Sequence, residues 1–133
     1  MNMNTSILVV IKNGVGELRF PQALKRDLFT STINCQSLFF DTNESPTNKG
    51  LFIVSDASFY IDQNGIQTRN VLGMFLHRAK AKTVYFRDNK LPITTPQDRL
   101  KIEIVDSEGD LQDISALATF DIAGCVSNKL LTI

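Results

Sequence analysis

The chain has 133 residues, of which 43% are hydrophobic and 21% charged, with a formal net charge of zero and no tryptophan. These values are ordinary for a folded domain and exclude a chain that is disordered throughout. The length fits one domain with a single core, and we assign residues 1–133 to that domain.

Charge is segregated along the chain. Residues 69–101 carry eight Lys or Arg against two Asp, a balance of +6. Residues 102–133 carry one Lys against six Asp or Glu, a balance of −5. A chain of this kind can complement a copy of itself or a neighbouring subunit electrostatically. The same pattern also arises when successive hairpins alternate their solvated faces.

Short apolar runs separated by turn residues are the main structural signal. Three pairs of runs flank a turn: 7–12 and 15–20 around Asn13-Gly14, 57–62 and 66–76 around Asn64-Gly65, and 100–105 and 111 onward around 107–110. Asn-Gly tolerates positive φ at both central positions of a tight turn, so it favours hairpins. The spacing therefore predicts three hairpins.

The remaining runs predict further strands over 33–40, 51–55, 82–87, 116–123 and 129–133. Residues 67–76 also match a short helix, but Gly73 and the surrounding rhythm favour a strand. One helical turn is predicted over 22–29, and residues 41–50 form the clearest loop. These elements predict an all-β fold, an antiparallel two-sheet sandwich of jelly-roll or immunoglobulin type with at most one or two short helical turns. The strand order stays open.

Residues for nucleophilic or metal chemistry are sparse. His77 is the only histidine, so any Ser–His or Cys–His pair must use it. It follows an apolar strand, and we interpret it as a surface or half-buried strand residue. One His and two distant Cys have no zinc-ligand spacing, and there is no glycine-rich phosphate loop. The sequence therefore predicts no enzyme, no cofactor and no metal site.

The acidic stretch 106–113 is the strongest metal candidate, because it places oxygen ligands at alternate positions. An EF-hand register, however, would have Leu111 in place of its glycine and Leu117 in place of its glutamate. We interpret the stretch as a solvated acidic hairpin, and calcium binding stays an open alternative.

The two cysteines, Cys35 and Cys125, each lie among apolar neighbours, which predicts buried thiols. A bridge between them requires adjacent strands, and that question stays open. The first six residues lack a basic segment, and no apolar run approaches the length of a membrane helix. We therefore expect synthesis in a cytoplasm, with no membrane span.

Candidate contact surfaces are the loop 41–50 and the basic stretch 78–90. Basic residues alternate with Tyr85 and Phe86 there, a pattern that also occurs in nucleic-acid binding. Lysines guarding a strand edge explain the same pattern, so nucleic acid is disfavoured as a partner. The residues predicted to make contacts are Arg78, Lys80, Lys82, Arg87, Lys90, Asn43, Glu44, Thr47, Asn48 and Lys49.

The segment 100–114 runs from an alternating strand through Asp106 and Gly109 to Asp113-Ile114. It resembles a strand–turn–strand element of virion proteins: the jelly-roll minor capsid, or penton, proteins of polintons, virophages and related tailless viruses. It is also similar to the N-terminal β-domain of phage baseplate proteins. The resemblance covers about fifteen positions and implies a virion building block without a catalytic residue.

The sequence thus predicts a structural protein, a capsid or virion component made in the host cytoplasm, whose partners are copies of itself or other structural subunits. An alternative is a small binding module that holds a glycan or peptide in its end loops. A third is an enzyme with dispersed carboxylates. That interpretation requires a pocket holding at least two of Asp41, Asp56, Asp62, Asp88 and Asp98.

Overall fold

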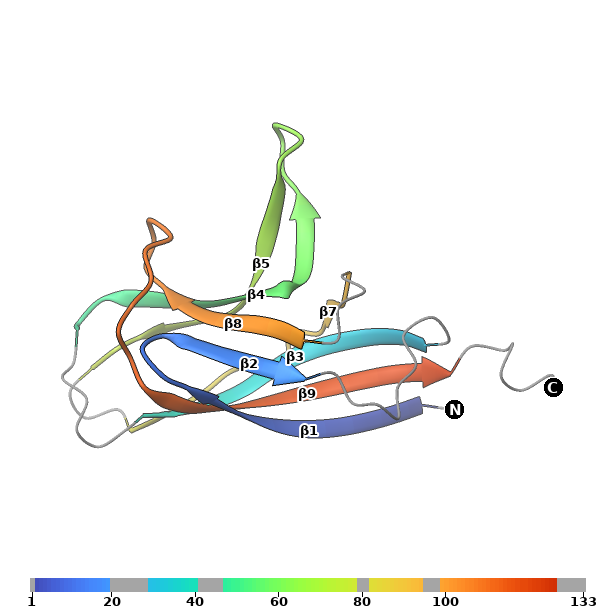
Figure 1. Ribbon diagram of the computed structural model, residues 1–133, viewed down its shortest axis with the longest axis horizontal. Helices are drawn as coiled ribbons and strands as arrows, with labels where there is room; N and C mark the ends of the chain where they lie inside the picture. The colour runs from blue at the N-terminus through green and yellow to red at the C-terminus, as the bar shows by residue number, and fades with distance from the viewer. Residues whose placement is uncertain (1, 20–28, 41–46, 79–81, 95–98, 127–133) are drawn as a thin grey trace.

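The computed structural model describes residues 2–19, 29–40, 47–78, 82–94 and 99–126. Every regular element in these ranges is a strand (Figure 1). The strands are β1 (Asn2–Ile11), β2 (Val15–Arg19), β3 (Phe29–Phe40), β4 (Gly50–Ile61), β5 (Gln67–Leu76), β6 (Thr83–Tyr85), β7 (Leu91–Pro92), β8 (Arg99–Val105) and β9 (Ala116–Val126). They form two antiparallel sheets packed face to face, which confirms the predicted sandwich.

The strand order identifies the type of sandwich. One sheet, here the β9 sheet, has the order β1-β9-β3-β6, with β7 also on β3, and the other, the β8 sheet, has the order β2-β8-β4-β5. The pairs β1–β9, β2–β8, β3–β6/β7 and β4–β5 are nested like the arms of one long hairpin. When this long hairpin folds over on itself, its two halves come side by side, and β9 pairs with β3 and β8 with β4. The result is a jelly roll and not an immunoglobulin sandwich.

The core lies between the two sheets and follows from period-two alternation. Leu100, Ile102 and Ile104 of β8 are fully buried, whereas Lys101 between them is exposed. Ala118, Phe120 and Ile122 of β9 face them from the other layer in the same cluster. Alternation over 100–105 predicted this strand, because successive side chains of a strand point to opposite faces.

Aromatic rings close one end of the core. The Phe40 ring lies 5.5 Å from that of Phe75 and 5.0 Å from that of His77, and Phe86 packs edge-on against Phe75 at 6.3 Å. His77 is 3% exposed, so the interpretation of a surface or half-buried residue is wrong. The strand end carries it between the sheets, where the Phe40 ring packs against it.

Of the three predicted hairpins, only β4–β5 has two strands that pair with each other along their length. At Asn13-Gly14 the tight turn forms with positive φ at both residues, but β1 continues onto β9 and β2 onto β8. After β8, Leu111 makes a single bridge to Val105 before the chain crosses to β9. Both departures have one cause: the arms bury apolar side chains in different layers of the core.

Several boundaries differ from the prediction. The runs 51–55 and 57–62 are one bent strand, β4, and the strand predicted over 33–40 begins earlier, at Phe29. The strand predicted over 82–87 keeps only the three residues of β6. The strand favoured over a helix for 67–76 is confirmed as β5. The strand predicted over 129–133 lies outside the described residues. So does the helical turn predicted over 22–29, except for Phe29.

The two cysteines lie on adjacent strands, but their register separates them. Cys35 of β3 pairs with Phe120, five residues from Cys125, so the two backbones are roughly 17 Å apart along the strands. A disulfide needs Cα atoms within about 7 Å. Cys35 is a free, buried thiol, as predicted. Burial raises its pKa to about 12, because the thiolate would lose its hydration.

Candidate functional site

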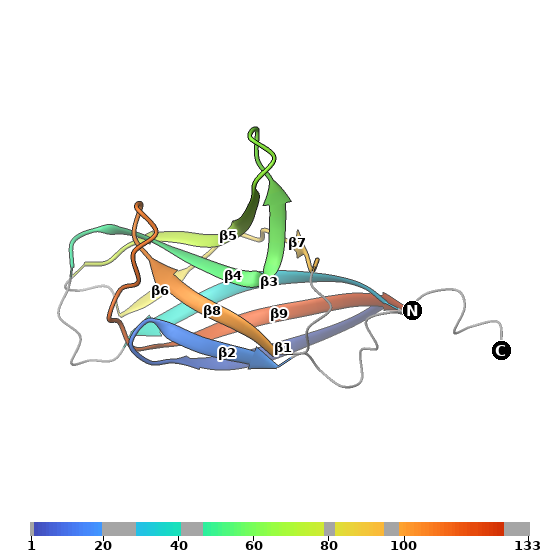
Figure 2. The same cartoon turned by 45° about the horizontal axis from the view of Figure 1, so that its top comes forward.

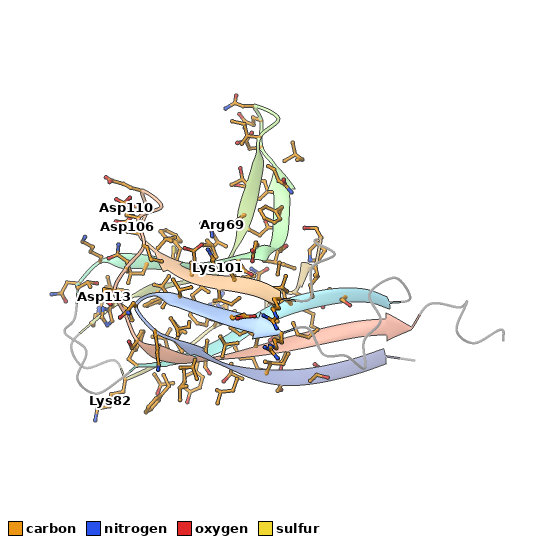
Figure 3. The ribbon with its side chains drawn as sticks, in the orientation of Figure 1. Arg69, Lys82, Lys101, Asp106, Asp110 and Asp113 are labelled. Atoms are coloured by element: carbon orange, nitrogen blue, oxygen red, sulfur yellow. The ribbon has the colours of Figure 1, made fainter. Side chains whose placement is uncertain are left out.

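The predicted basic contact residues do not converge on one patch. Arg78 follows β5, Lys82 precedes β6, and Arg87 and Lys90 lie between β6 and β7; all four are exposed. Figure 3 separates Lys82 from Arg69 and Lys101, which belong to the β8 sheet. Lys80 lies outside the described residues. The basic stretch 78–90 is thus divided between a strand end and two connections.

The loop predicted over 41–50 is described from Thr47 onward, and Asn43 and Glu44 lie outside the described part. The backbone of Asn48 donates to the His77 carbonyl at 2.9 Å, and the His77 amide donates to the Lys49 carbonyl at 3.1 Å. The Thr47 amide donates to Nδ1 of the His77 ring at 3.1 Å. These bonds extend the β4–β5 ladder, so Thr47, Asn48 and Lys49 are tied to the sheet.

The acidic turn uses its first carboxylate internally. Oδ1 of Asp106 accepts the amides of Glu108 and Asp110 at 3.0 and 2.9 Å, and Oδ2 accepts the Gln112 side-chain amide at 3.3 Å. Among the described residues, no group of three or more His, Cys, Asp or Glu is placed to hold a metal ion. The described part of the chain also has no helix long and apolar enough to cross a membrane.

The carboxylates named for an enzyme are dispersed. Asp56, Asp62 and Asp88 line three different pockets. Asp41 and Asp98 lie outside the described residues. A small polar pocket of about 210 Å³ on the β9 sheet brings Asp88 and Asp121 together with amide side chains. There Asp121 accepts hydrogen bonds from Ser6 and Gln36, and Asn34 donates to Asp88.

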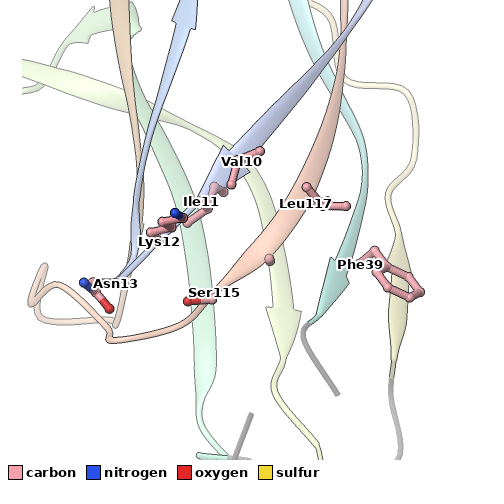
Figure 4. A pocket seen from close by; sticks show the side chains of 8 residues that line it. Val10, Ile11, Lys12, Asn13, Phe39, Ser115 and Leu117 are labelled. Atoms are coloured by element: carbon pink, nitrogen blue, oxygen red, sulfur yellow. The ribbon is translucent and has the colours of Figure 1, made fainter. Parts of the chain in front are cut away.

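An apolar row crosses the outer face of the β9 sheet. Val10 of β1 and Phe39 of β3 both pair with Leu117 of β9, so three apolar side chains lie side by side on this face. They are 56%, 48% and 37% exposed, respectively. They line a concavity of about 490 Å³, here called the apolar pocket (Figure 4). Its other lining residues are Ile11, Lys12, Asn13, Ser115 and Ala116.

A second apolar feature rises from the β8 sheet. The outer parts of β4 and β5 form the projecting hairpin, residues 59–69, which points away from the sandwich in both views (Figures 1 and 2). Near its tip Tyr60, Ile61 and Ile66 are 48%, 68% and 60% exposed. At its base, Arg69 forms an ion pair with Glu103 of β8.

The bend of β4 that redirects the hairpin is held by hydrogen bonds. The β4–β5 register jumps between Val54 and Phe59, leaving four residues of β4 opposite one residue of β5. The pairing of β4 with β8 ends at Ser55, which is opposite Ile102. The amide of Lys101, the preceding residue of β8, donates instead to Oδ1 of Asp56 at 2.6 Å. Thr94 receives the Phe59 amide on its hydroxyl at 3.1 Å and donates its own amide to the Ala57 carbonyl at 2.9 Å.

Two buried serines complete the bend. The Ser55 hydroxyl accepts the Ala57 amide at 3.0 Å, and the Ser58 hydroxyl accepts the Asn70 side-chain amide at 2.9 Å. Both serines are fully buried. Because buried polar groups are costly to leave unpaired, these bonds favour one direction of the projecting hairpin.

The contact residues predicted from sequence omitted both apolar surfaces. The sequence contains a signal for the apolar pocket. Consecutive residues of a strand point to opposite faces of the sheet, and the run Leu8-Val9-Val10-Ile11 is apolar throughout. Both faces of this strand therefore carry apolar side chains, and the core covers only one of them. The projecting hairpin carries no such signal, because its arms continue strands whose inner parts belong to the core. A scan against protein-family models finds none that matches this chain, and no curated protein matches its sequence.

Proposed function

We propose that this chain is a non-enzymatic structural subunit, a capsid or other virion component, that works by packing against copies of itself or neighbouring subunits. One observation carries the proposal: large apolar side chains are exposed on both outer faces of the sandwich. A two-sheet antiparallel sandwich normally keeps its outer faces polar. Contiguous apolar patches beyond a few hundred Å² are rare on monomeric proteins and mark interaction sites.

Twelve large apolar side chains are exposed among the described residues, and six of them lie in the apolar row and near the tip of the projecting hairpin. The twelve are Leu8, Val10, Phe39, Tyr60, Ile61, Ile66, Val71, Met74, Leu76, Tyr85, Leu111 and Leu117. Burying them between subunits would stabilise an assembly by about 25 cal/mol for each Å² removed from water. The segregated charges of 69–101 and 102–133 would add complementary attraction between copies.

The jelly-roll order supports the virion assignment without deciding it. Capsid and lectin domains share this architecture, so the fold alone does not select a function. The assignment to a virion rests on the exposed apolar faces together with the resemblance of residues 100–114 to virion proteins.

Light scattering behind a sizing column, over a range of protein and salt concentrations, tests the proposal. We expect a mass above that of the monomer. Partial loosening at high salt would indicate a contribution from the segregated charges, because salt screens exposed charges. A monomer at high concentration that captures no structural partner would overturn the proposal. Fluorescence titration of Tyr60 and Tyr85 with glycan and peptide libraries would then test the alternative of a binding module.

A further inference from the structure

We propose that the projecting hairpin of one copy inserts its apolar tip into the apolar pocket of the next copy, so that the chain assembles head to tail. This inference rests on the proposed function and names the contact through which it works. Its basis is that one molecule carries both an exposed apolar projection and an exposed apolar concavity, on surfaces that cannot reach each other within one copy.

The projection is built to be rigid. At the tip, Oδ1 of Asp62 accepts the amides of Asn64 and Ile66, both at 2.9 Å. At the base, the bend of β4 is fixed in direction through Asp56 and Thr94. A preorganised element loses little conformational freedom on binding, so more of the burial energy of its apolar side chains remains as affinity.

The concavity has a suitable size and chemistry. Its volume of about 490 Å³ lies in the range of pockets that enclose small ligands, about 300–1,000 Å³. Val10, Phe39 and Leu117 supply apolar walls. Among the described residues, Lys12 is the only charged one that lines it, and Asp62 is the only charged residue of the hairpin between positions 59 and 68. The two charges are opposite, so docking would bring together complementary groups.

The two features lie on opposite sides of the molecule. The pocket is on the outer face of the β9 sheet, and the hairpin projects from the side of the β8 sheet (Figures 1 and 2). Each copy therefore offers one projection and one pocket to two different neighbours. Such a contact is heterologous: it closes into a ring if the rotation between copies permits and otherwise grows into a filament.

The expected contact is small. The hairpin supplies eleven residues, residues 59–69, whereas a standard interface uses about 20–30 residues on each side. A single contact should be weak, and closure into a ring should stabilise the assembly, because it adds one contact without adding a copy. An apolar contact should also persist in high salt, unlike one made only by surface charges.

A pair of complementary variants tests this geometry. Ile61→Asp places a charge on the projection, and Val10→Asp places one in the pocket; both positions are more than half exposed, so each variant should fold. We expect each alone to lower the association constant at least tenfold in light scattering. A 1:1 mixture should form a dimer and nothing larger, because the intact hairpin of one variant fits the intact pocket of the other.

Ser107→Asp is the matched control, since Ser107 is an exposed polar residue in the 106–110 turn and lies outside both features. It should leave the wild-type mass unchanged. Circular dichroism and thermal unfolding confirm that each variant is folded, and Phe39→Ser replaces Val10→Asp if the latter is not.

The outcomes separate this contact from the proposed function. If the wild type is oligomeric and neither variant lowers its mass, or if Ser107→Asp lowers it equally, the head-to-tail contact is wrong and the structural role stands. A mixture that grows beyond a dimer also overturns it. A wild-type monomer at high concentration overturns the contact, and with no structural partner it overturns the proposed function as well.

Discussion

Residues 62–66 and 106–110 form the same turn twice. In each, Oδ1 of the leading aspartate accepts the amides two and four positions further on. In each, the backbone of that aspartate also exchanges hydrogen bonds with the fourth and fifth residues, and the fourth residue is a glycine with positive φ. The shared pattern Asp-x-x-Gly therefore determines the local geometry in both places.

The chain takes a different course after each of the two turns. After 62–66 it pairs back along β4 and completes the projecting hairpin. After 106–110 only the bridge of Val105 to Leu111 forms, and Ile114 then enters the core on the way to β9. The comparison teaches that turn chemistry is local, whereas the pairing of the arms depends on where the next apolar side chains can be buried.

The largest expected difference involves a third turn, at Gly14. Gly14, Gly65 and Gly109 have φ of 80°, 76° and 86°, so alanine is strained at each by about 1 kcal/mol or more. A Cβ at Gly14 would lie 2.0 Å from the Gln112 carbonyl oxygen, whereas the other two positions are open. We expect Gly14→Ala to cost about 3 kcal/mol, because overpacking of about 1–3 kcal/mol adds to the strain.

Denaturant unfolding of the three alanine variants measures this difference. We expect Gly65→Ala and Gly109→Ala to cost about 1 kcal/mol each. Equal losses for all three would show that φ alone governs these glycines and that the packing of Gly14 against the 111–114 connection contributes nothing.

A smaller effect should distinguish the two aspartate turns. Asp106→Ala should lower the free energy of unfolding by about 1–2 kcal/mol, because it leaves amides without acceptors in a connection that joins the sheets. Asp62→Ala should change it by less than about 0.5 kcal/mol, because the tip lies outside the core and, once the Asp62 bonds are lost, opens without unfolding the domain. Its signature should be faster hydrogen exchange within residues 59–69.

The matched substitutions Asp62→Asn and Asp106→Asn keep an acceptor oxygen. Each should therefore stay closer to the wild type than the corresponding alanine variant, in the free energy of unfolding and in hydrogen exchange. If Asp62→Ala destabilises the whole domain as much as Asp106→Ala, the projecting hairpin is coupled to the core and is not an independent element.

A further variant sharpens the comparison at the base of the hairpin. Thr94→Val removes the hydroxyl that accepts the Phe59 amide while keeping the shape of the side chain. We expect a loss of about 1 kcal/mol, typical of one hydrogen bond. The rate of amide hydrogen exchange, measured by NMR, should increase more at Phe59 than at Asp106. Unchanged exchange at Phe59 would mean that Thr94 does not hold the bend.

A last effect depends on pH and concerns the buried thiol of Cys35 in the core. The pKa of Cys35 is raised to about 12, so its folded form keeps the proton above the pH at which the unfolded thiol loses it. The contribution to stability is therefore full below about pH 9 and falls as the pH rises toward 12. In a Cys125→Ser background, the free energy of unfolding should decrease less steeply between about pH 9 and pH 12 when Cys35 is replaced by alanine.

Thiol labelling in the same background adds a kinetic check. Cys35 should react with a thiol reagent near neutral pH only as fast as the domain opens, because the thiol is buried and protonated. Asp106→Ala should speed labelling and Asp62→Ala should not. Rapid labelling of the wild type would contradict the burial of Cys35.

The success of sequence reasoning differs between elements for physical reasons. The strand at Leu100 to Val105 was predictable, because one face is buried and alternation records it directly. The hairpin at residues 7–20 was predicted with the correct turn but the wrong pairing, since a turn constrains four residues and not the partners of the arms. The contact surfaces remain predictions, and the apolar pocket was missed, because Val10, Phe39 and Leu117 come together only through β9.

By itself, the sequence determined the class of fold, the turns at Asn13, Asp62 and Asp106, and the burial of Cys35, because each depends on alternation or on a few adjacent residues. Only the tertiary structure decided the jelly-roll order, the crossing of two predicted hairpins between sheets, and the projection of residues 59–69. These features depend on which distant strands share the core, and no local pattern records that competition.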